Sequence, residues 1–473
     1  MTAPIADAMR NYDSDRALAF HTPGHKQGLG AHELLRELIT DAGLRREVSL
    51  MEELDDLHSP RDCIMRAQQL AAELWHADHA IFFVNGTTAA VQTMILSTLA
   101  PNDRVLIPRN AHRCVISAIT LSGAKPIFLS PQFDPDFGIA LNITLDTVRT
   151  AVEKYPDARA IVITSPNYYG VAADLKSIAE LAHQHDMLLL VDEAHGAHLQ
   201  FSDRLPPSAM DSNADMSAQS THKLLGSLTQ SSMLMINSAR LDLERVRRVS
   251  SMLQSTSPNY LLLASLDISR MQMQSQGNRL INRAVDLAQS LRQSINAIAG
   301  LRVFDQPTLF DPTKLTVNVA ELGLTGLEAE QILRHELKIQ CELSDASNVL
   351  FLITYADTQA EIDRLLDALR KLASLKKSAR ISTKKFSPPP AIIEPIMTPR
   401  EAFYSPTTSI ELHNAIGKIC GEEVTFYPPG IPILCPGELI TAEIVSSIEE
   451  NLSLGRRLVA AADLRLHSIK IIP

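Results

Sequence analysis

Short apolar segments alternate with helical periodicity over residues 61–192, and this alternation constrains the fold more than any other feature. The apolar segments are residues 81–84, 105–107, 126–129, 160–164 and 187–191. Helices are expected through residue 75, after residues 87 and 112, and over residues 144–155 and 174–185. Apolar strands separated by helices are typical of a parallel sheet that helices cover. We therefore predict an α/β fold with a mostly parallel central sheet.

The pattern changes after this region, which indicates smaller α+β domains in the C-terminal part of the chain. Residues 261–299 are expected to form one long helix, and residues 301–375 form strands and helices of a smaller domain. Three consecutive prolines and several basic residues then indicate a linker. The predicted divisions are an N-terminal segment at 1–60, a large domain at 61–260, the connecting helix and a small α/β domain at 261–375, a linker at 376–395, and a C-terminal domain at 396–473.

The C-terminal domain contains the segment TFYPPGIP at residues 425–432. Proline lacks the N–H group that helices and central strands need, so we expect a shaped loop or an edge strand here.

Composition excludes several classes of function. The net charge is −10 and no extended basic block occurs, which disfavours nucleic acid and anionic membranes as partners. The five cysteines are scattered without a C-x-x-C pair, which favours reduced thiols over a zinc site or a disulfide framework. The polar N-terminus does not resemble a signal peptide, and no apolar run approaches the roughly 20 residues that cross a bilayer. We expect a cytoplasmic enzyme without a metal.

Polar residues follow the predicted strands, at the sheet edge where open α/β folds bind ligands. Asp192 ends the run MLLLVD. Gly86, Thr87 and Thr88 lie at a strand-to-helix junction, where free backbone N–H groups and threonine hydroxyls can receive a phosphate. A simple helix cap at Thr87 is the alternative interpretation.

The tripeptide Thr221-His222-Lys223 adds a candidate for covalent chemistry. A lysine amine can condense with pyridoxal phosphate, and a buried carboxylate such as Asp192 can keep the pyridine nitrogen protonated. A lysine by itself is usually a solvated surface group. It is the order of a strand-end aspartate, His195 three residues later, and the Thr-His-Lys run that indicates a pyridoxal-phosphate enzyme, with Thr221 and His222 as further phosphate ligands.

Other interpretations of these residues remain to be weighed. His112 follows another strand and could stack on the pyridine ring, although a histidine in such a place is more often a surface or hydrogen-bonded residue. Asp192, His195 and His198 form a D-x-x-H-x-x-H string that could bind a metal, but a metal would not explain Lys223. The same segment spells DEAH, as in helicases, yet the chain has no G-x-x-x-x-G-K-[ST] phosphate loop.

Seven motifs occur in order along nearly the whole chain. They are FHTPGHKQG at 20–28, ELDDLHSP at 53–60, VNGTTAA at 84–90, RNAHRCV at 109–115, DEAHGAH at 192–198, STHK at 220–223 and YPPGIPILCPGE at 427–438. The set resembles the Orn/Lys/Arg decarboxylase family of fold type I pyridoxal-phosphate enzymes. One departure is Cys114, where the family pattern has serine.

The resemblance implies roles for the site residues. Lys223 would hold the cofactor covalently, Asp192 would pair with the pyridine nitrogen, His112 would stack on the ring, and His195 would lie beside it. The residues implied at the phosphate are Gly86, Thr87, Thr88, Thr221 and His222.

The implied reaction is decarboxylation of a basic L-amino acid in polyamine biosynthesis. Arginine, giving agmatine and carbon dioxide, is favoured because the chain resembles the short family form without an N-terminal wing domain; lysine and ornithine stay open. An acidic group should meet the cationic head of the substrate. Glu438 is the first candidate, and Asp55 and Asp56 follow, although a carboxylate in such a place is more often solvated or structural.

The resemblance also implies a homodimer or homotetramer, in which residues 1–60 contribute to the active site or the dimer interface. Two alternatives of other kinds remain. An aminotransferase or aldolase of the same fold would lack the PGHKQG and YPPGIP segments, and a non-catalytic regulatory homologue would not need Lys223.

Overall fold

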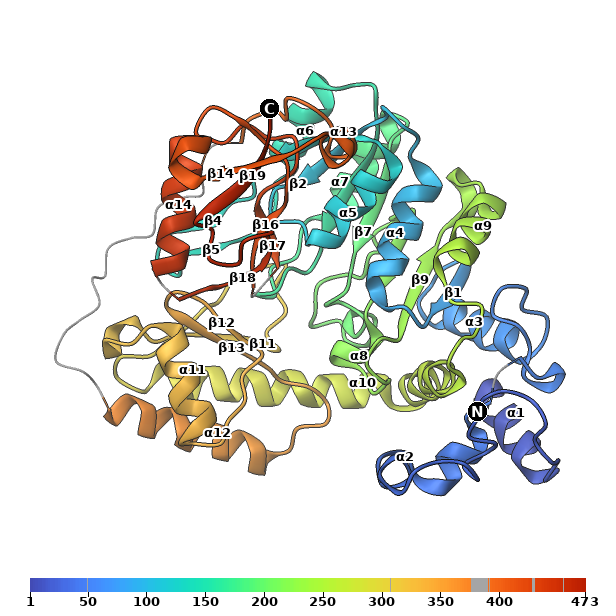
Figure 1. Cartoon of the computed structure of the whole chain (residues 1–473). Helices are drawn as coiled ribbons and strands as arrows, with labels where there is room; N and C mark the ends of the chain where they lie inside the picture. The colour runs from blue at the N-terminus through green and yellow to red at the C-terminus, as the bar shows by residue number, and fades with distance from the viewer. Residues whose placement is uncertain (49, 307, 376–389, 391, 428–429, 454) are drawn as a thin grey trace. The chain divides into compact units, whose positions relative to one another are not determined.

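The chain forms two compact units in the computed structural model (Figure 1). The structure describes residues 1–473 except 49, 307, 376–389, 391, 428–429 and 454. The first unit comprises Met1–Ser97, Val191–Ser202 and Pro207–Arg279. The second comprises Thr98–Leu190, Asp203–Pro206 and Leu280–Pro473.

A seven-stranded sheet has the order β1-β9-β8-β7-β6-β2-β3. Its strands are β1 (His79–Phe83), β2 (Arg104–Pro108), β3 (Lys125–Leu129), β6 (Ala158–Thr164), β7 (Leu188–Asp192), β8 (Met216–Gln219) and β9 (Ser232–Ile236). Strand β2 is parallel to β3 and β6, whereas β9 is antiparallel to both β1 and β8. The prediction of an α/β fold with a mostly parallel central sheet is confirmed.

The predicted helices are present between these strands. They are α3 (Cys63–Leu74), α4 (Gly86–Thr98), α5 (Arg113–Ser122), α6 (Leu145–Lys154) and α7 (Leu175–Gln184). Side-chain caps explain where two of them begin: Thr144 accepts a hydrogen bond from the backbone N–H of Thr147, and Asp174 accepts one from that of Ser177. Helices α8 (Thr221–Leu224), α9 (Leu243–Leu253) and α10 (Tyr260–Asn296) follow along the chain.

The N-terminal segment, for which the sequence predicted no elements, contains α1 (Pro4–Ser14), α2 (Glu33–Arg46) and a 3-10 turn at Glu52–Leu54. The start of this N-terminal segment is anchored by a buried ion pair on α10. Asp267 Oδ1 lies 2.7 Å from Arg270 Nη2, and both side chains are 0% exposed. Asp267 also accepts the backbone N–H of Ile5, while Arg270 donates to the carbonyl of Thr2. The pair thereby holds the N-terminus against α10 within the first unit.

The second unit contains smaller antiparallel sheets. One has the order β10-β11-β13-β12, with helices α11 (Gly326–His335) and α12 (Gln359–Ser374). Its strands are β10 (Arg302–Val303), β11 (Lys314–Asn318), β12 (Leu343–Ser344) and β13 (Asn348–Leu352). Helix α11 packs on β13 and on α12 (Figure 1). A two-stranded hairpin joins β4 (Phe133–Asp134) to β5 (Ile139–Ala140).

The C-terminal part has two three-stranded sheets, β14-β19-β15 and β17-β16-β18, and a core of its own. Its elements are α13 (Pro399–Tyr404), β14 (Thr408–Glu411), β15 (Ile419–Cys420), β16 (Val424–Tyr427), β17 (Ile431–Leu434), α14 (Ala442–Ser453), β18 (Arg457–Ala460) and β19 (Ser468–Ile472). The smaller α+β domains are thus confirmed as a fold type, while the predicted domain boundaries stay predictions. Most of the predicted linker at 376–395 lies outside the described residues.

One local prediction was partly wrong. Residues 425–427 belong to β16, the central strand of its sheet, although a loop or edge was expected for 425–432. The strand is possible because none of its residues is a proline, so its N–H groups can serve both neighbours. Pro432 lies in β17, which is an edge strand as expected. Pro428 and Pro429 lie outside the described residues.

In the described part of the chain, every helix is either too short or too polar to span a lipid bilayer.

Replacing Asp267 by Asn should lower the free energy of unfolding by about 3–5 kcal/mol, because Arg270 would keep a buried charge without its counter-ion. Urea denaturation followed by circular dichroism measures this loss. Asp286→Asn is the matched control, since Asp286 lies on the same helix in an exposed pair with Arg204 and should change stability by less than about 1 kcal/mol. Equal losses in the two variants would contradict the anchoring role of the buried pair.

Candidate cofactor site

Lys223 and Asp192 meet in the first unit at the ends of two strands. Asp192 is the last residue of β7, and Lys223 lies in α8, directly after β8. The Nζ atom of Lys223 is 3.0 Å from Nε2 of His195. The structure therefore brings together three of the predicted catalytic residues.

The Asp192 carboxylate is almost fully buried, with 3% of the residue exposed. Burial raises the pKa of Asp192, and the positive charge of Lys223 opposes that rise. The backbone N–H of Ala194 donates to Oδ1 at 3.2 Å, and within the described residues no other hydrogen bond reaches this carboxylate. A buried carboxylate with acceptor positions left over is suited to a cationic ring nitrogen.

The residues before Lys223 offer groups for a phosphate. Thr221 is buried, and in the described structure its Oγ1 atom has no hydrogen-bond partner. An orphaned buried hydroxyl is costly unless a ligand satisfies it. His222 Nδ1 lies 2.8 Å from the carbonyl oxygen of Ser231, so Nδ1 carries the proton, because a carbonyl only accepts. Burial lowers the pKa of His222 and favours its neutral form.

The residues predicted to bind phosphate at the start of α4 differ in their hydrogen bonds and exposure. Gly86 has φ +78, and its N–H donates to the carbonyl of Gln230 at 2.8 Å. A side chain added at Gly86 would meet no atom within 4 Å, so the space in front of it is open. Thr88 is exposed, and its role at a phosphate stays a prediction.

Thr87 has a role that the sequence did not reveal. Its hydroxyl contacts Ser220 Oγ and donates to Ser232 Oγ at 2.9 Å. Ser232 in turn donates to the carbonyl of Gln219. These contacts connect the start of α4 with the residues just before Lys223. Ser220 stood inside the STHK motif, but only the fold shows that Thr87 is its partner.

His112 belongs to the second unit, where it caps helix α5. Its Nδ1 accepts the backbone N–H of Cys114 at 3.3 Å. Gly430 lies against the ring, since a side-chain carbon added to it would be 3.4 Å from His112 Nε2. Stacking of His112 on the cofactor stays a prediction.

Glu438, also in the second unit, is paired with an arginine. Its Oε2 accepts hydrogen bonds from Arg109 Nη2 at 3.0 Å and from the N–H of Cys435 at 2.6 Å. Arg109 further donates to the carbonyls of Pro432 and Ile433. Burial raises the pKa of Glu438 and Arg109 opposes that rise. Among the described residues no hydrogen bond reaches Oε1, so a substrate role for Glu438 stays a prediction that concerns this second oxygen.

Asp55 and Asp56 are engaged in the loop before α3. The Asp55 carboxylate accepts the backbone N–H groups of Asp56, Arg61, Asp62, Ile64 and Met65. Asp56 Oδ1 accepts the N–H of His58 at 2.9 Å. These contacts support the structural interpretation of both carboxylates, and we do not place either of them at the substrate.

Taken together, the α/β fold, the strand-end carboxylate Asp192 and the neighbouring Lys223 define an enzyme of the fold type I pyridoxal-phosphate class. The buried hydroxyl of Thr221 and the incompletely bonded Asp192 fit the two ends of that cofactor.

Comparison with known proteins identifies the family within this class of enzymes. Residues 3–310 match the major domain of the Orn/Lys/Arg decarboxylases, and residues 379–452 match their C-terminal domain. The chain belongs to the Orn/Lys/Arg decarboxylase family, as the motifs predicted, and is a pyridoxal-phosphate enzyme.

Individual relatives agree with this assignment. The chain is 43% identical to an arginine decarboxylase of Bacillus subtilis over 479 residues, which covers 99% of this chain and 97% of the relative. It is 42% identical to an arginine decarboxylase of Bacillus anthracis with the same coverage. Among solved structures, the lysine decarboxylase of Francisella novicida has a TM-score of 0.83 at 21% identity and covers 100% of this chain and 81% of that one. The last similarity shows the shared fold.

Binding of pyridoxal phosphate should take up a proton at His222. In the cofactor-free protein the pKa of His222 is lowered, so its Nε2 is unprotonated at neutral pH and cannot donate to an anion. A bound phosphate raises that pKa, and affinity should therefore fall as the pH rises through the bound-state value. Calorimetry in buffers of different ionisation enthalpy measures the uptake.

His222→Gln is the control for this proton uptake, because glutamine donates a hydrogen bond without taking up a proton. The variant should show a smaller uptake than the wild type. Identical uptake in both proteins would assign the proton to another group.

Proposed function

We propose that this chain decarboxylates L-arginine to agmatine and carbon dioxide. The observation that supports the cofactor chemistry is the meeting of Lys223 with a buried Asp192 at the ends of adjacent strands, and membership of the Orn/Lys/Arg decarboxylase family supports decarboxylation as the reaction type. The choice of arginine is supported by 43% identity to the Bacillus subtilis arginine decarboxylase over nearly the full chain.

The candidate site residues of the first unit each have a task in this proposal. Bound pyridoxal phosphate supplies an electron sink for the breaking bond between Cα and the carboxylate. Asp192 keeps a positive charge on the ring nitrogen, because its buried carboxylate has no other cation than Lys223 close by among the described residues. Thr221 and His222 bind the phosphate, with Gly86 and Thr88 at its open side.

Lys223 would hold the cofactor through its side-chain amine. His195 Nε2 lies 3.0 Å from the Lys223 nitrogen, within range to accept a proton from it or to return one. His195 is buried, so this exchange is shielded from bulk water.

The cationic head of arginine needs an acceptor, and Glu438 Oε1 is our candidate. The oxygen belongs to a buried carboxylate whose other oxygen is fixed by Arg109 and Cys435. This fixation orients Oε1 in advance, whereas the charge of Arg109 weakens the attraction for a second cation.

We further propose a cytoplasmic homodimer or homotetramer with residues 1–60 at the active site or the interface. Large apolar side chains of this segment are exposed in the single chain, namely Leu18, Phe20, Leu29, Leu34 and Leu38. Exposed apolar side chains in such number are typical of surfaces that a partner covers.

The purified wild-type protein should absorb visible light through its bound cofactor and release carbon dioxide from arginine faster than from lysine or ornithine. Lys223→Ala should lose both the absorbance and the carbon dioxide release, since no other residue takes over the covalent bond. Parallel assays of carbon dioxide and amine products test all three substrates. Preference for lysine or ornithine would overturn the arginine proposal, and inactivity on all three would favour the regulatory homologue.

Glu438→Gln should raise the KM for arginine about tenfold, because one charge-assisted hydrogen bond to the guanidinium becomes a neutral one. The visible absorbance of the cofactor should not change. Glu449→Gln, an exposed residue of α14 paired with His413, is the matched control and should leave KM as it is. A normal KM in Glu438→Gln would remove Glu438 from the substrate site.

A further inference from the structure

Glu193 follows Asp192 directly in the chain and belongs to the first unit. It is 0% exposed. Oε1 accepts the backbone N–H of Ala209 at 2.8 Å, and Oε2 accepts hydrogen bonds from Ser217 Oγ at 2.6 Å and from Gln219 Nε2 at 2.8 Å. Within the described residues none of its partners is a cation, whereas buried carboxylates are usually paired with one.

The partners of Glu193 lie on the elements that carry the cofactor site. The backbone N–H of Glu193 donates to the carbonyl of Ala218 at 3.0 Å. Ser217 and Gln219 belong to β8, whose end leads through Ser220 into the helix with Lys223. One carboxylate therefore fastens the end of β7, where Asp192 lies, to the end of β8.

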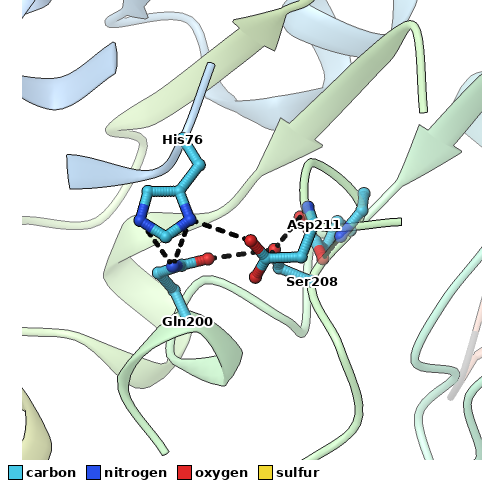
Figure 2. A network of polar contacts seen from close by, with 6 residues as sticks. His76, Gln200, Ser208 and Asp211 are labelled. Atoms are coloured by element: carbon cyan, nitrogen blue, oxygen red, sulfur yellow. Dashed lines mark hydrogen bonds and ion pairs between the residues drawn. The ribbon is translucent and has the colours of Figure 1, made fainter. Parts of the chain in front are cut away.

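The third partner of Glu193, the backbone N–H of Ala209, lies in a turn that is held by further hydrogen bonds. Figure 2 shows this outer network: His76 Nδ1 lies 2.8 Å from Asp211 Oδ1, and Ser208 Oγ lies 2.8 Å from Asp211 Oδ2 and 3.0 Å from Gln200 Oε1. Ser208 and Asp211 flank Ala209, and Gln200 belongs to the segment that follows Asp192. These contacts restrict the movement of the Ala209 N–H group, which donates to Glu193.

We propose that Glu193 is a positioning residue that sets the Asp192 carboxylate against the segment bearing Lys223. This inference rests on the proposed pyridoxal-phosphate chemistry. A carboxylate suits the task because its two oxygens accept hydrogen bonds from three donors in two segments, the turn at Ala209 and strand β8. The cost of this arrangement is visible in the pKa of Glu193, which burial raises to about 7.

Glutamine at position 193 would not reproduce the arrangement. Its amide nitrogen would point hydrogens at Ser217 and Gln219, which are donors in the wild type. Gln219 can turn its own amide so that its Oε1, which has no partner in the described structure, accepts from the new amide nitrogen, but its Nε2 is then buried without an acceptor. The ends of β7 and β8 would shift relative to each other, and with them Asp192 and Lys223.

The test measures cofactor binding in Glu193→Gln and in the matched surface variant Glu244→Gln, which is an exposed residue of α9. Glu193→Gln should weaken pyridoxal-phosphate affinity about tenfold, the size expected for one lost hydrogen bond to a charged group. It should also lower the visible circular dichroism per bound cofactor and lower kcat more than it raises KM. Glu244→Gln should match the wild type in all three quantities.

A rescue separates positioning from simple loss of stability. The double variant Glu193→Gln and Gln219→Glu exchanges carboxylate and amide, so the contact between the two side chains is restored and cofactor affinity should recover in part. Where Glu193→Gln does not fold, Ser217→Ala removes a single donor to Glu193 and should change affinity and circular dichroism in the same direction to a smaller extent.

Wild-type affinity and circular dichroism in Glu193→Gln, or in Ser217→Ala where that variant is used, would overturn the positioning role. A wild-type protein without any cofactor absorbance would instead overturn the proposed function, so the two failures are distinguishable.

Discussion

The burial of Asp192 at the end of β7 is the constraint on which the site depends. A carboxylate with 3% exposure is unfavourable as an anion, and burial raises its pKa accordingly. The charge of Lys223 works in the opposite direction and keeps the anionic form accessible. A cofactor whose ring nitrogen is cationic would complete the compensation. The site is thus built so that binding of the cofactor relieves an electrostatic cost already present in the folded chain.

The acidic residues of the chain show how partners determine role. Asp267 forms a buried ion pair with an arginine and anchors the N-terminus. Asp55 accepts hydrogen bonds from five backbone N–H groups and stabilises a loop. Glu193 has three neutral donors in two segments and holds the ends of two strands together. Of these four carboxylates, Asp192 has the fewest hydrogen bonds within the described residues, namely one from Ala194. Its incomplete bonding, and not its position in a motif, is the physical argument for a ligand there.

Much of the fold and the centre of the site followed from sequence. The alternation of apolar and helical segments predicted strands β1, β2, β3, β6 and β7 and the helices between them, because period and burial are coupled in a helix-covered sheet, but it did not predict the hairpin of β4 and β5. Strands β8 and β9 were missed, because they lie after the alternation of strands and helices over residues 61–192 on which the prediction rested. Contacts such as Thr87 with Ser220 could not be predicted, since they join residues that lie far apart in the chain. The same holds for Arg109, whose pairing with Glu438 only the fold reveals.

The most direct test of the central claim is to locate the cofactor on the chain. Borohydride reduction of the purified protein makes the bond between lysine and pyridoxal phosphate permanent, and mass spectrometry of its peptides then identifies the modified lysine. We expect the cofactor mass on Lys223 and on no other lysine in stoichiometric amount. Modification of a different lysine, or of none, would contradict the account of the site.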